Sequence, residues 1–436
     1  MWSLRNFQKV TKSAETALLP LKAGDGKTIS LASLIEEKVD SIKDGSYTIV
    51  APTLGNGHLQ TIYTSSPALE NFDKIYYGRR IITWEEDGAS VTCDFVVPPP
   101  ANDEQWEKQF AYAPVSDLPP HPVRTRYLTP EELEGLHSDD NKPMVIALHG
   151  LSGGSHENYV RATLAALNSP EYGFECVVLN SRGCARSVIT TPVLFNGAWT
   201  LDVRRFIKDL RKRYPNRPFY MVGYSLGASI LANYLGQEGA DTDITGACIL
   251  ANPWDLSQAS YELNSTYMGQ KVYSPIMASN LKKLVKNHLK VLEQRPDFDS
   301  SKLGQCKTIL DFDTNFTATL FGFDTAMDYY RHGSSVNRLM NNHTPSLILH
   351  ALDDPIAPKT SLPYTEVQKN PYTYMVTSSL GGHLGWFEKG GQRWFTKPIA
   401  DFFKAMNDNV DHTKKSSTTI IRPKRLWKED RFQVSI

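Results

Sequence analysis

Several features that mark secreted, metal-binding or nucleic-acid-binding proteins are scarce in this sequence. Its 436 residues include five cysteines, which are widely spaced and form no CxxC pair. A disulfide framework or a cysteine-based zinc site is therefore not expected, and a reducing compartment fits best. The 47 basic and 47 acidic residues give a formal net charge of zero. Because nucleic-acid binding normally requires a basic excess, we expect no nucleic-acid partner.

Long apolar runs are also missing. No stretch approaches the roughly 18 consecutive apolar residues of a transmembrane helix, and the N-terminus lacks the apolar block of a secretory signal. We expect an intracellular, cytoplasmic protein, and peripheral contact with lipid droplets or an organelle membrane is compatible with this expectation. The tail after Asp411 is either solvated or weakly attached to an anionic lipid surface. Its basic residues are Lys414, Lys415, Arg422, Lys424, Arg425, Lys428 and Arg431.

Motifs for phosphate and metal binding are absent from the sequence as well. There is no G-x-x-x-x-G-K-[ST] phosphate loop, no H-E-x-x-H pair and no cluster of histidine and cysteine. We therefore expect a protein that uses neither a cofactor nor a metal ion. No feature of the sequence indicates an obligate protein partner.

Short, continuous apolar segments alternate with helical segments through most of the chain. Strands without polar alternation, separated by helices, are typical of a parallel sheet that helices cover on both faces. Two earlier segments, rich in β-branched and aromatic residues, flank Asp87-Gly88 and predict a β-hairpin. Together these segments predict an α/β fold with a mostly parallel, eight-stranded sheet. The predicted strands are residues 74–86, 90–98, 143–148, 174–179, 219–223, 244–250, 346–350 and 372–377.

One pentapeptide carries a strong chemical signal. Gly223-Tyr224-Ser225-Leu226-Gly227 fits the G-x-S-x-G pattern and lies directly between a predicted strand and a predicted helix. In this context a sharp turn projects the serine oxygen above the sheet, and the glycines leave room for the neighbouring strand and helix. The pattern predicts Ser225 as the nucleophile of a serine hydrolase with the α/β-hydrolase fold. The alternative is a tight turn with a capping serine.

A serine hydroxyl needs a base, and the base needs an acid that orients it. In α/β-hydrolases these partners follow in the order serine, acid, histidine. His383 lies in a glycine-rich turn after the last predicted strand and is the predicted base. Asp353 and Asp354 follow the preceding strand. We expect Asp354 to be the acid, because it stands before Pro355 where the chain should leave the strand, and Asp353 to support the loop.

A second glycine-rich turn, His149-Gly150-Leu151-Ser152-Gly153-Gly154, follows the predicted strand at 143–148. Such a turn exposes backbone N–H groups at the edge of the sheet. We expect the N–H of Leu151 to pair with the N–H of Leu226 and to hold the oxyanion that develops during acyl transfer. A phosphate loop is the competing interpretation, but the lysine of that motif is missing here.

The rhythm of strands and helices divides the chain into five segments. An N-terminal extension of short helices and loops covers residues 1–70. The core covers 71–253 and 343–408, with an irregular surface excursion at 101–142, and a basic tail covers 409–436. Residues 254–342 form a cap inserted into the core. One helix of the cap has an apolar stripe that either docks the cap on the core or contacts a substrate's acyl chain. The stripe is Leu281, Leu284, Val285, Leu289 and Leu292.

Six segments combine into a family pattern: NGHLQT (56–61), LHGLSGGS (148–155), NSRGCARS (180–187), GYSLGAS (223–229), LDDPIAP (352–358) and GGHLGW (381–386). The chain resembles the branch of the α/β-hydrolase superfamily that holds fungal medium-chain fatty acid ethyl ester synthases/esterases. Related fungal monoacylglycerol lipases and mammalian lipid-acting proteins belong to the same branch. The resemblance extends from about Gly55 to Phe403, and TRYLTPEELE and ANPWDL favour the ethyl ester synthase side. The family's nucleophile corresponds to Ser225, its histidine to His383 and its acid to the pair Asp353-Asp354.

The resemblance implies a serine esterase/acyltransferase that acts on medium-chain fatty acyl esters. Such an enzyme hydrolyses these esters and transfers acyl groups from the substrate acyl-CoA to short alcohols. No H-x-x-x-x-D acyltransferase motif is present, so transfer is expected to proceed through acyl-Ser225. A monoacylglycerol lipase is the first alternative, and a catalytically silent lipid-binding protein is the remote one. The NGHLQT segment has no chemistry that its residues predict, and His58 is expected to order the N-terminal segment.

Overall fold

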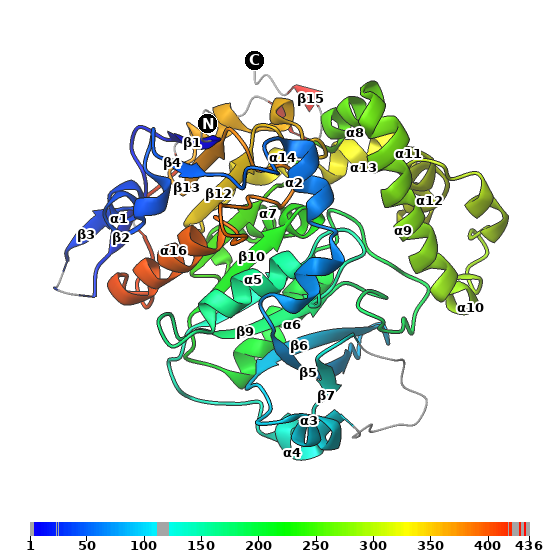
Figure 1. The fold of residues 1–436 in the computed structure, drawn as a ribbon, viewed down its shortest axis with the longest axis horizontal. Coiled ribbons are helices and arrows are strands. Elements are labelled where there is room, and N and C mark those ends of the chain that lie inside the picture. Colours follow the sequence, from blue (N-terminus) through cyan, green and yellow to red (C-terminus); the bar gives the residue numbers. More distant parts are fainter. Residues whose placement is uncertain are drawn as a thin grey trace.

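A single large sheet runs through the computed structural model, which describes residues 4–22, 24, 26–110, 122–416, 418–420, 427–428 and 431–432 (Figure 1). Its strands are β1 (Arg5–Lys12), β4 (Tyr47–Ile49), β5 (Tyr76–Thr83), β6 (Ser90–Val97), β7 (Thr125–Tyr127), β8 (Met144–Leu148), β9 (Glu175–Asn180), β10 (Phe219–Tyr224), β11 (Gly246–Leu250), β12 (Ser346–Ala351) and β13 (Thr373–Ser378). They lie in the order β4-β1-β13-β12-β11-β10-β8-β9-β6-β5-β7. Two small hairpins lie outside the sheet, β2 (Leu18–Pro20) with β3 (Thr28–Ser30) and β14 (Trp427–Lys428) with β15 (Arg431–Phe432).

The six central strands, from β9 through β8, β10, β11 and β12 to β13, pair in parallel and are almost wholly buried. Strands that are covered on both faces need no polar alternation, which explains their continuous apolar runs. The helices on one face are α1 (Leu31–Lys38), α5 (Asn158–Leu167) and α16 (Thr396–Asn409). Those on the other face are α6 (Leu201–Arg213), α7 (Leu226–Glu238), α14 (Val336–Leu339) and α15 (Tyr364–Val367). The predicted mostly parallel sheet between two helical layers is therefore confirmed.

The sheet is larger than the eight strands that the sequence predicted, because the edges recruit three more. β1 pairs antiparallel with β13, and β4 pairs antiparallel with β1, so the N-terminal extension adds strands where only short helices and loops were expected. The third, β7, has three residues and pairs in parallel with β5. β1 reads RNFQKVTK and β7 is very short, so neither carries an apolar run. These strands form because a sheet edge offers unpaired backbone groups, which the local sequence does not reveal.

The segment predicted as an irregular excursion at 101–142 is also partly regular. Besides β7 it contains α3 (Asp103–Phe110) and α4 (Pro130–Glu134), and the latter begins with a capping box of Thr129 and Glu132. Residues 111–121 of this segment lie outside the described part of the chain. The remaining short helices near the core are α2 (Gly57–Tyr63), η1 (Asp40–Ile42), η2 (Pro67–Asn71), η3 (Gly239–Asp241) and η7 (Lys359–Ser361).

A group of helices connects β11 to β12 and lies to one side of the sheet, on the right in Figure 1. Its elements are α8 (Leu256–Ser265), η4 (Gly269–Tyr273), α9 (Ser274–Asn287), α10 (Leu289–Leu292), η5 (Ser300–Gly304), α11 (Ile309–Phe312), η6 (Asp313–Thr317), α12 (Ala318–Phe321) and α13 (Ala326–Gly333), followed by α14. The predicted amphipathic helix is divided at His288 into α9 and α10. Its stripe belongs to a separate apolar cluster with Leu194 and Phe195, and Leu281 and Leu284 also line a cavity.

The C-terminal segment packs against β2 before it leaves the described residues. Ser416 Oγ donates to the carbonyl oxygen of Leu18 at 2.8 Å, and the N–H of Leu18 donates to Thr418 Oγ1 at 2.8 Å. Arg422, Lys424 and Arg425 lie outside the described part, so lipid attachment of the tail stays a prediction. Among the helices that the structure describes, none combines the length and the apolarity needed to cross a bilayer.

Candidate active site

Ser225 occupies the sharp turn between β10 and α7, with φ 52° and ψ −117°. A positive φ is strained for a residue with a side chain, and such strain concentrates at functional sites. The surrounding backbone packs tightly, because a Cβ atom built on Gly227 would lie 2.2 Å from the carbonyl oxygen of Leu148 on β8. The N–H of Ser225 donates to the carbonyl oxygen of Leu250 at 3.0 Å and ties the turn to β11. The G-x-S-x-G pattern thus forms the strand–turn–helix arrangement that its chemistry requires.

His383 connects Ser225 to Asp354 through a chain of hydrogen bonds. His383 Nδ1 donates to Asp354 Oδ2 at 2.8 Å, and Ser225 Oγ donates to His383 Nε2 at 2.8 Å. The Asp354 side chain is fully buried, and its Oδ1 accepts the N–H groups of Ile356 (2.8 Å) and Ala357 (2.9 Å). These bonds fix the carboxylate, so the imidazole keeps its proton on Nδ1 and leaves Nε2 to accept the serine proton.

Asp353 lies beside this chain but contacts the backbone of the histidine loop. Its Oδ1 accepts the N–H of Gly382 at 2.9 Å, and its Oδ2 has no hydrogen-bond partner within the described ranges. Burial raises the pKa of Asp353, and the nearby Asp354 carboxylate raises it further. The structure therefore brings Asp354, rather than Asp353, to the imidazole of His383.

The NGHLQT segment, whose role the sequence did not reveal, forms α2 and contacts two loops of the site. One loop carries His383 and the other carries Asp353 and Asp354. We call this set of contacts the clamp. Thr61 Oγ1 accepts the N–H of His383 at 2.8 Å. Gly57 packs directly on the other loop, where a Cβ atom would lie 1.9 Å from the carbonyl oxygen of Asp353. These two contacts join residues that are 322 and 296 positions apart along the chain. The motif itself was the only signal of this role, because no local pattern encodes so distant a contact.

Other side chains of the NGHLQT segment extend the clamp. Gln60 is fully buried, and its Oε1 accepts the N–H of Phe387 at 2.8 Å just after the histidine turn. His58 Nδ1 shares a hydrogen bond of 2.8 Å with Tyr273 Oη, and the two rings stack with centroids 5.8 Å apart. Tyr273 belongs to η4, so His58 joins α2 to the helices between β11 and β12. His58 was expected to order the N-terminal segment, and the structure shows that it connects this segment to η4.

A buried arginine also supports the histidine loop. The Arg393 guanidinium donates to the carbonyl oxygens of Leu384 and Gly385, directly after His383. Burial lowers the pKa of Arg393 to about 9. Sequence reasoning missed this residue, because a single arginine beyond the last strand has no recognisable motif.

Leu151 and Leu226, the residues of the oxyanion hypothesis, lie beside Ser225. Both line the same cavity as Ser225, and neither backbone N–H has an acceptor among the described residues. The turn before Leu151 is held by His149, whose Nδ1 donates to the carbonyl oxygen of Gly150 at 2.7 Å. His149 Nε2 accepts the N–H of Ser181 at 3.1 Å. Burial lowers the pKa of His149 to about 4, so its ring stays neutral and fixes the turn.

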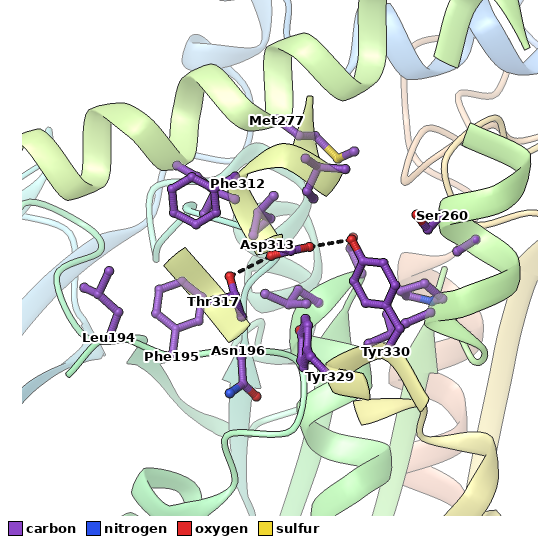
Figure 2. A pocket seen from close by; sticks show the side chains of 18 of the residues that line it. Leu194, Phe195, Asn196, Ser260, Met277, Phe312, Asp313, Thr317, Tyr329 and Tyr330 are labelled. Atoms are coloured by element: carbon purple, nitrogen blue, oxygen red, sulfur yellow. Dashed lines mark hydrogen bonds between the residues drawn. The ribbon is translucent and has the colours of Figure 1, made fainter. Parts of the chain in front are cut away.

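Two cavities meet at Ser225 and share Leu151, Met277 and Ile356 as lining residues. The first, here called the apolar cavity, extends under the helices that follow β11, and Figure 2 shows part of its wall. The second, here called the polar cavity, lies on the side of His383. The apolar cavity is lined mainly by aliphatic and aromatic side chains, among them Leu194, Phe195, Leu281, Leu284, Phe312 and Leu320. The polar cavity is lined by groups that include Thr61, Thr64, His156, Glu157, Asn280 and His383.

The fold and this site define the α/β hydrolase class. A family model described as the alpha/beta hydrolase fold matches residues 143–390, and the chain belongs to this family. It is 42% identical over 400 residues to a monoacylglycerol lipase of Saccharomyces cerevisiae, covering 89% of this chain and 87% of the relative. It is 33% identical over 434 residues to medium-chain fatty acid ethyl ester synthase/esterase 2 of the same yeast, covering 91% of this chain and 94% of the relative. A solved esterase structure from Pyrococcus furiosus aligns with a TM-score of 0.44 at 12% identity, covering 78% of this chain and 95% of that one.

Proposed function

We propose that this chain is a serine ester hydrolase that cleaves medium-chain fatty acyl esters through an acyl-Ser225 intermediate. The observation that carries the proposal is the unbroken hydrogen-bond chain from Asp354 through His383 to Ser225, which ends beside an apolar cavity. The names of the two yeast relatives support the same reaction class. All the groups that the reaction needs are side chains and backbone of this chain, and we propose that it uses no cofactor.

The reaction follows from this geometry in two halves. His383 Nε2 accepts the Ser225 hydroxyl proton while Oγ attacks the ester carbonyl, and the N–H groups of Leu151 and Leu226 stabilise the resulting oxyanion. The intermediate collapses to acyl-Ser225, and the imidazolium returns the proton to the departing alcohol. A water or alcohol then attacks the acyl group with His383 again acting as base, which releases acid or a new ester. Asp354 stabilises the imidazolium in both halves.

The two cavities provide separate places for the two parts of an ester. An alkyl chain buries apolar surface in the apolar cavity, where about 0.8 kcal/mol is gained for each methylene removed from water. The alcohol part, or the incoming acceptor, occupies the polar cavity beside His383 and the hydroxyl groups of Thr61 and Thr64. Because both cavities open on Ser225, a single bound ester can occupy them together.

The acceptor decides between two versions of the function. We propose transfer from acyl-CoA to short alcohols alongside hydrolysis, since His383 serves as base for either acceptor and the cavity at its side can hold an alcohol. Monoacylglycerol hydrolysis is the second candidate, and the 42% identical yeast relative favours it. The polar lining of the second cavity also suits a glycerol group, whose hydroxyls need hydrogen-bond partners when they leave water.

Access from a lipid surface is a further part of the proposal. Leu59 and Ile62 on α2 are 44% and 52% exposed, and Ile276 on α9 is 55% exposed. Their neighbours Thr61 and Met277 line the polar cavity. These exposed apolar side chains can enter the boundary of a lipid layer and place the cavity entrance against it.

A matched substrate panel tests the proposal. Purified protein is incubated with p-nitrophenyl esters of increasing chain length, with monoacylglycerols, and with acyl-CoA plus ethanol. We expect a medium-chain optimum for hydrolysis and measurable ethyl ester formation. Both activities and fluorophosphonate labelling should disappear together in Ser225→Ala, with a rate loss of roughly 10⁴-fold or more. If monoacylglycerol is hydrolysed and no ethyl ester forms at high ethanol, the function is that of a lipase. If the Ser225→Ala variant is still labelled, the nucleophile is a different residue.

A further inference from the structure

One carboxylate lies within the mainly apolar wall of the apolar cavity. Asp313 begins η6, a π-helical turn, and its side chain lines the apolar cavity (Figure 2). Only 6% of the residue is exposed, and the cavity wall around it includes Phe312 and Leu320. Burial of a charge is costly unless the charge is paired, and π-helical turns are frequent at functional sites. The mechanism proposed above makes no use of this group.

The partners of Asp313 are hydroxyl groups rather than cations. Thr317 Oγ1 donates to Asp313 Oδ1 at 2.6 Å, and Tyr330 Oη donates to Asp313 Oδ2 at 2.7 Å. Across the described ranges, no lysine, arginine or histidine nitrogen lies within 4.0 Å of this carboxylate. Burial raises the pKa of Asp313 to about 6, and the two hydroxyl bonds offset this only in part.

The three residues Asp313, Thr317 and Tyr330, here called the Asp313 cluster, can bind one more hydrogen-bond donor. A carboxylate oxygen can accept about two hydrogen bonds, and each oxygen of Asp313 accepts one from its hydroxyl partner. In Figure 2 the carboxylate spans the space between Thr317 and Tyr330. The hydroxyl-bearing side chain of Ser260, on α8, lines the same cavity. A hydroxyl group that enters the cavity therefore finds an acceptor with unused capacity.

We propose that the Asp313 cluster is a subsite for a hydroxyl group carried by the acyl chain, so that hydroxylated medium-chain acyl esters are a substrate class of this enzyme. The inference rests on the proposed function, because the acyl chain must enter the apolar cavity from Ser225. The hydroxyl donates to the Asp313 carboxylate and takes the place of the water that this group loses on burial. A hydrogen bond to a charged acceptor of this kind is roughly twice as strong as one between neutral groups.

The same arrangement disfavours an unsubstituted chain that reaches as far as Asp313. Such a chain displaces water from the carboxylate and gives it no donor in return. A site built to bond a hydroxyl rejects the analogue that lacks it, because the polar group of the site is left unpaired. Selectivity should therefore depend on where along the acyl chain the hydroxyl is placed.

The test compares pairs of p-nitrophenyl esters that differ only in an ω-hydroxyl group. The acyl chains span roughly 6 to 12 carbons, and kcat is normalised to the active sites counted with a fluorophosphonate probe. We expect at least one chain length at which kcat/KM for the hydroxylated ester exceeds that of its partner by about tenfold or more. Hydroxylated esters that are no better than their partners at any length would overturn the inference, and this result needs no variant.

Variants assign the selectivity to the cluster. Asp313→Leu should abolish the preference for the hydroxylated ester, and Asp313→Asn, which keeps a weaker neutral acceptor, should reduce it. Asp324→Asn removes a carboxylate from an exposed position of the same region and should leave the preference unchanged. If Asp313→Leu does not fold, Asp313→Asn decides the question. A preference that survives in a folded Asp313 variant would overturn the assignment to this cluster.

The same assay separates this inference from the proposed function. Short esters such as p-nitrophenyl butyrate report on Ser225 chemistry alone. Hydrolysis of these esters together with probe labelling, but without any hydroxyl preference, overturns only the Asp313 subsite. Absence of both labelling and hydrolysis overturns the proposed function, and the subsite with it.

Discussion

Two buried carboxylates, Asp354 at the catalytic corner and Asp313 under the cap helices, are stabilised in different ways. Asp354 accepts three N–H bonds, from the imidazole of His383 and from the backbone of Ile356 and Ala357. Asp313 accepts two hydroxyl bonds, and burial raises its pKa to about 6. The first carboxylate is enclosed by N–H donors, which fix its position beside the imidazole. The second keeps unused acceptor capacity next to a cavity, which suits a group that awaits a ligand.

The largest effect is expected for Asp354, and the adjacent Asp353 provides the matched control. Asp354→Asn should lower kcat by roughly 10⁴-fold, because the amide no longer fixes the productive tautomer of His383 or stabilises its imidazolium. Asp353→Asn should cost no more than about 100-fold, because Asp353 only bonds the backbone of the histidine loop. The measurement is kcat on a short p-nitrophenyl ester. A larger loss for Asp353→Asn would transfer the role of the acid to that residue.

A smaller loss of activity is expected when the contact between α2 and the loop of His383 is removed. Thr61→Val removes the acceptor for the N–H of His383 while it preserves the volume of the side chain. The histidine turn should then shift by a fraction of an ångström, with a loss in kcat of about 10- to 100-fold and little change in KM. Thr360→Val, at an exposed threonine outside the site, serves as the control and should change neither constant. An unchanged kcat in Thr61→Val would mean that α2 does not position the base.

The smallest effect concerns Asp313 and the pH dependence of the free energy of unfolding. The pKa of Asp313 is about 6 in the folded chain against an ordinary value of 3.8, so the folded state binds more protons between these values. Wild-type stability should therefore fall as the pH rises from about 4 to about 6, and the loss should persist above that range. The Asp313→Asn variant should not show this loss of stability, because the amide does not titrate in this pH range.

Urea unfolding at pH 4 and pH 8 measures the effect. The stability of Asp313→Asn relative to the wild type should increase by roughly 2.4 kcal/mol between these two pH values, because the pKa of Asp313 rises from 3.8 in the unfolded chain to about 6 in the folded chain. Asp324→Asn, which alters an exposed carboxylate, should show little of this change. A pH-independent difference between wild type and Asp313→Asn would show that Asp313 is not held in an unfavourable environment.

The residues that the structure joins in the candidate site could be predicted because their chemistry restricts both residue type and sequence context. A nucleophilic serine in this fold needs a strand, a tight turn and a helix, and GYSLG carries all three signals. The histidine and the acid follow later strands in a fixed order, which leaves few candidates for either residue. The contacts of Thr61, Gln60 and Arg393 could not be derived in this way. Thr61 and Gln60 bond a loop that is more than 300 positions away in the sequence. Arg393 bonds a nearby loop but belongs to no recognisable motif itself.

The sequence by itself determined the parallel core, since strands buried on both faces must be continuously apolar and the central strands of this sheet are. It also determined Ser225 and His383 as the candidate nucleophile and base. Only the tertiary structure decided that β1 and β4 extend the sheet, because edge pairing satisfies backbone groups whatever the side chains are. Only the tertiary structure placed Asp313 in a cavity wall as well. Burial and hydrogen-bond partners depend on which helices pack together, and no local pattern around DFDTNFT records that packing.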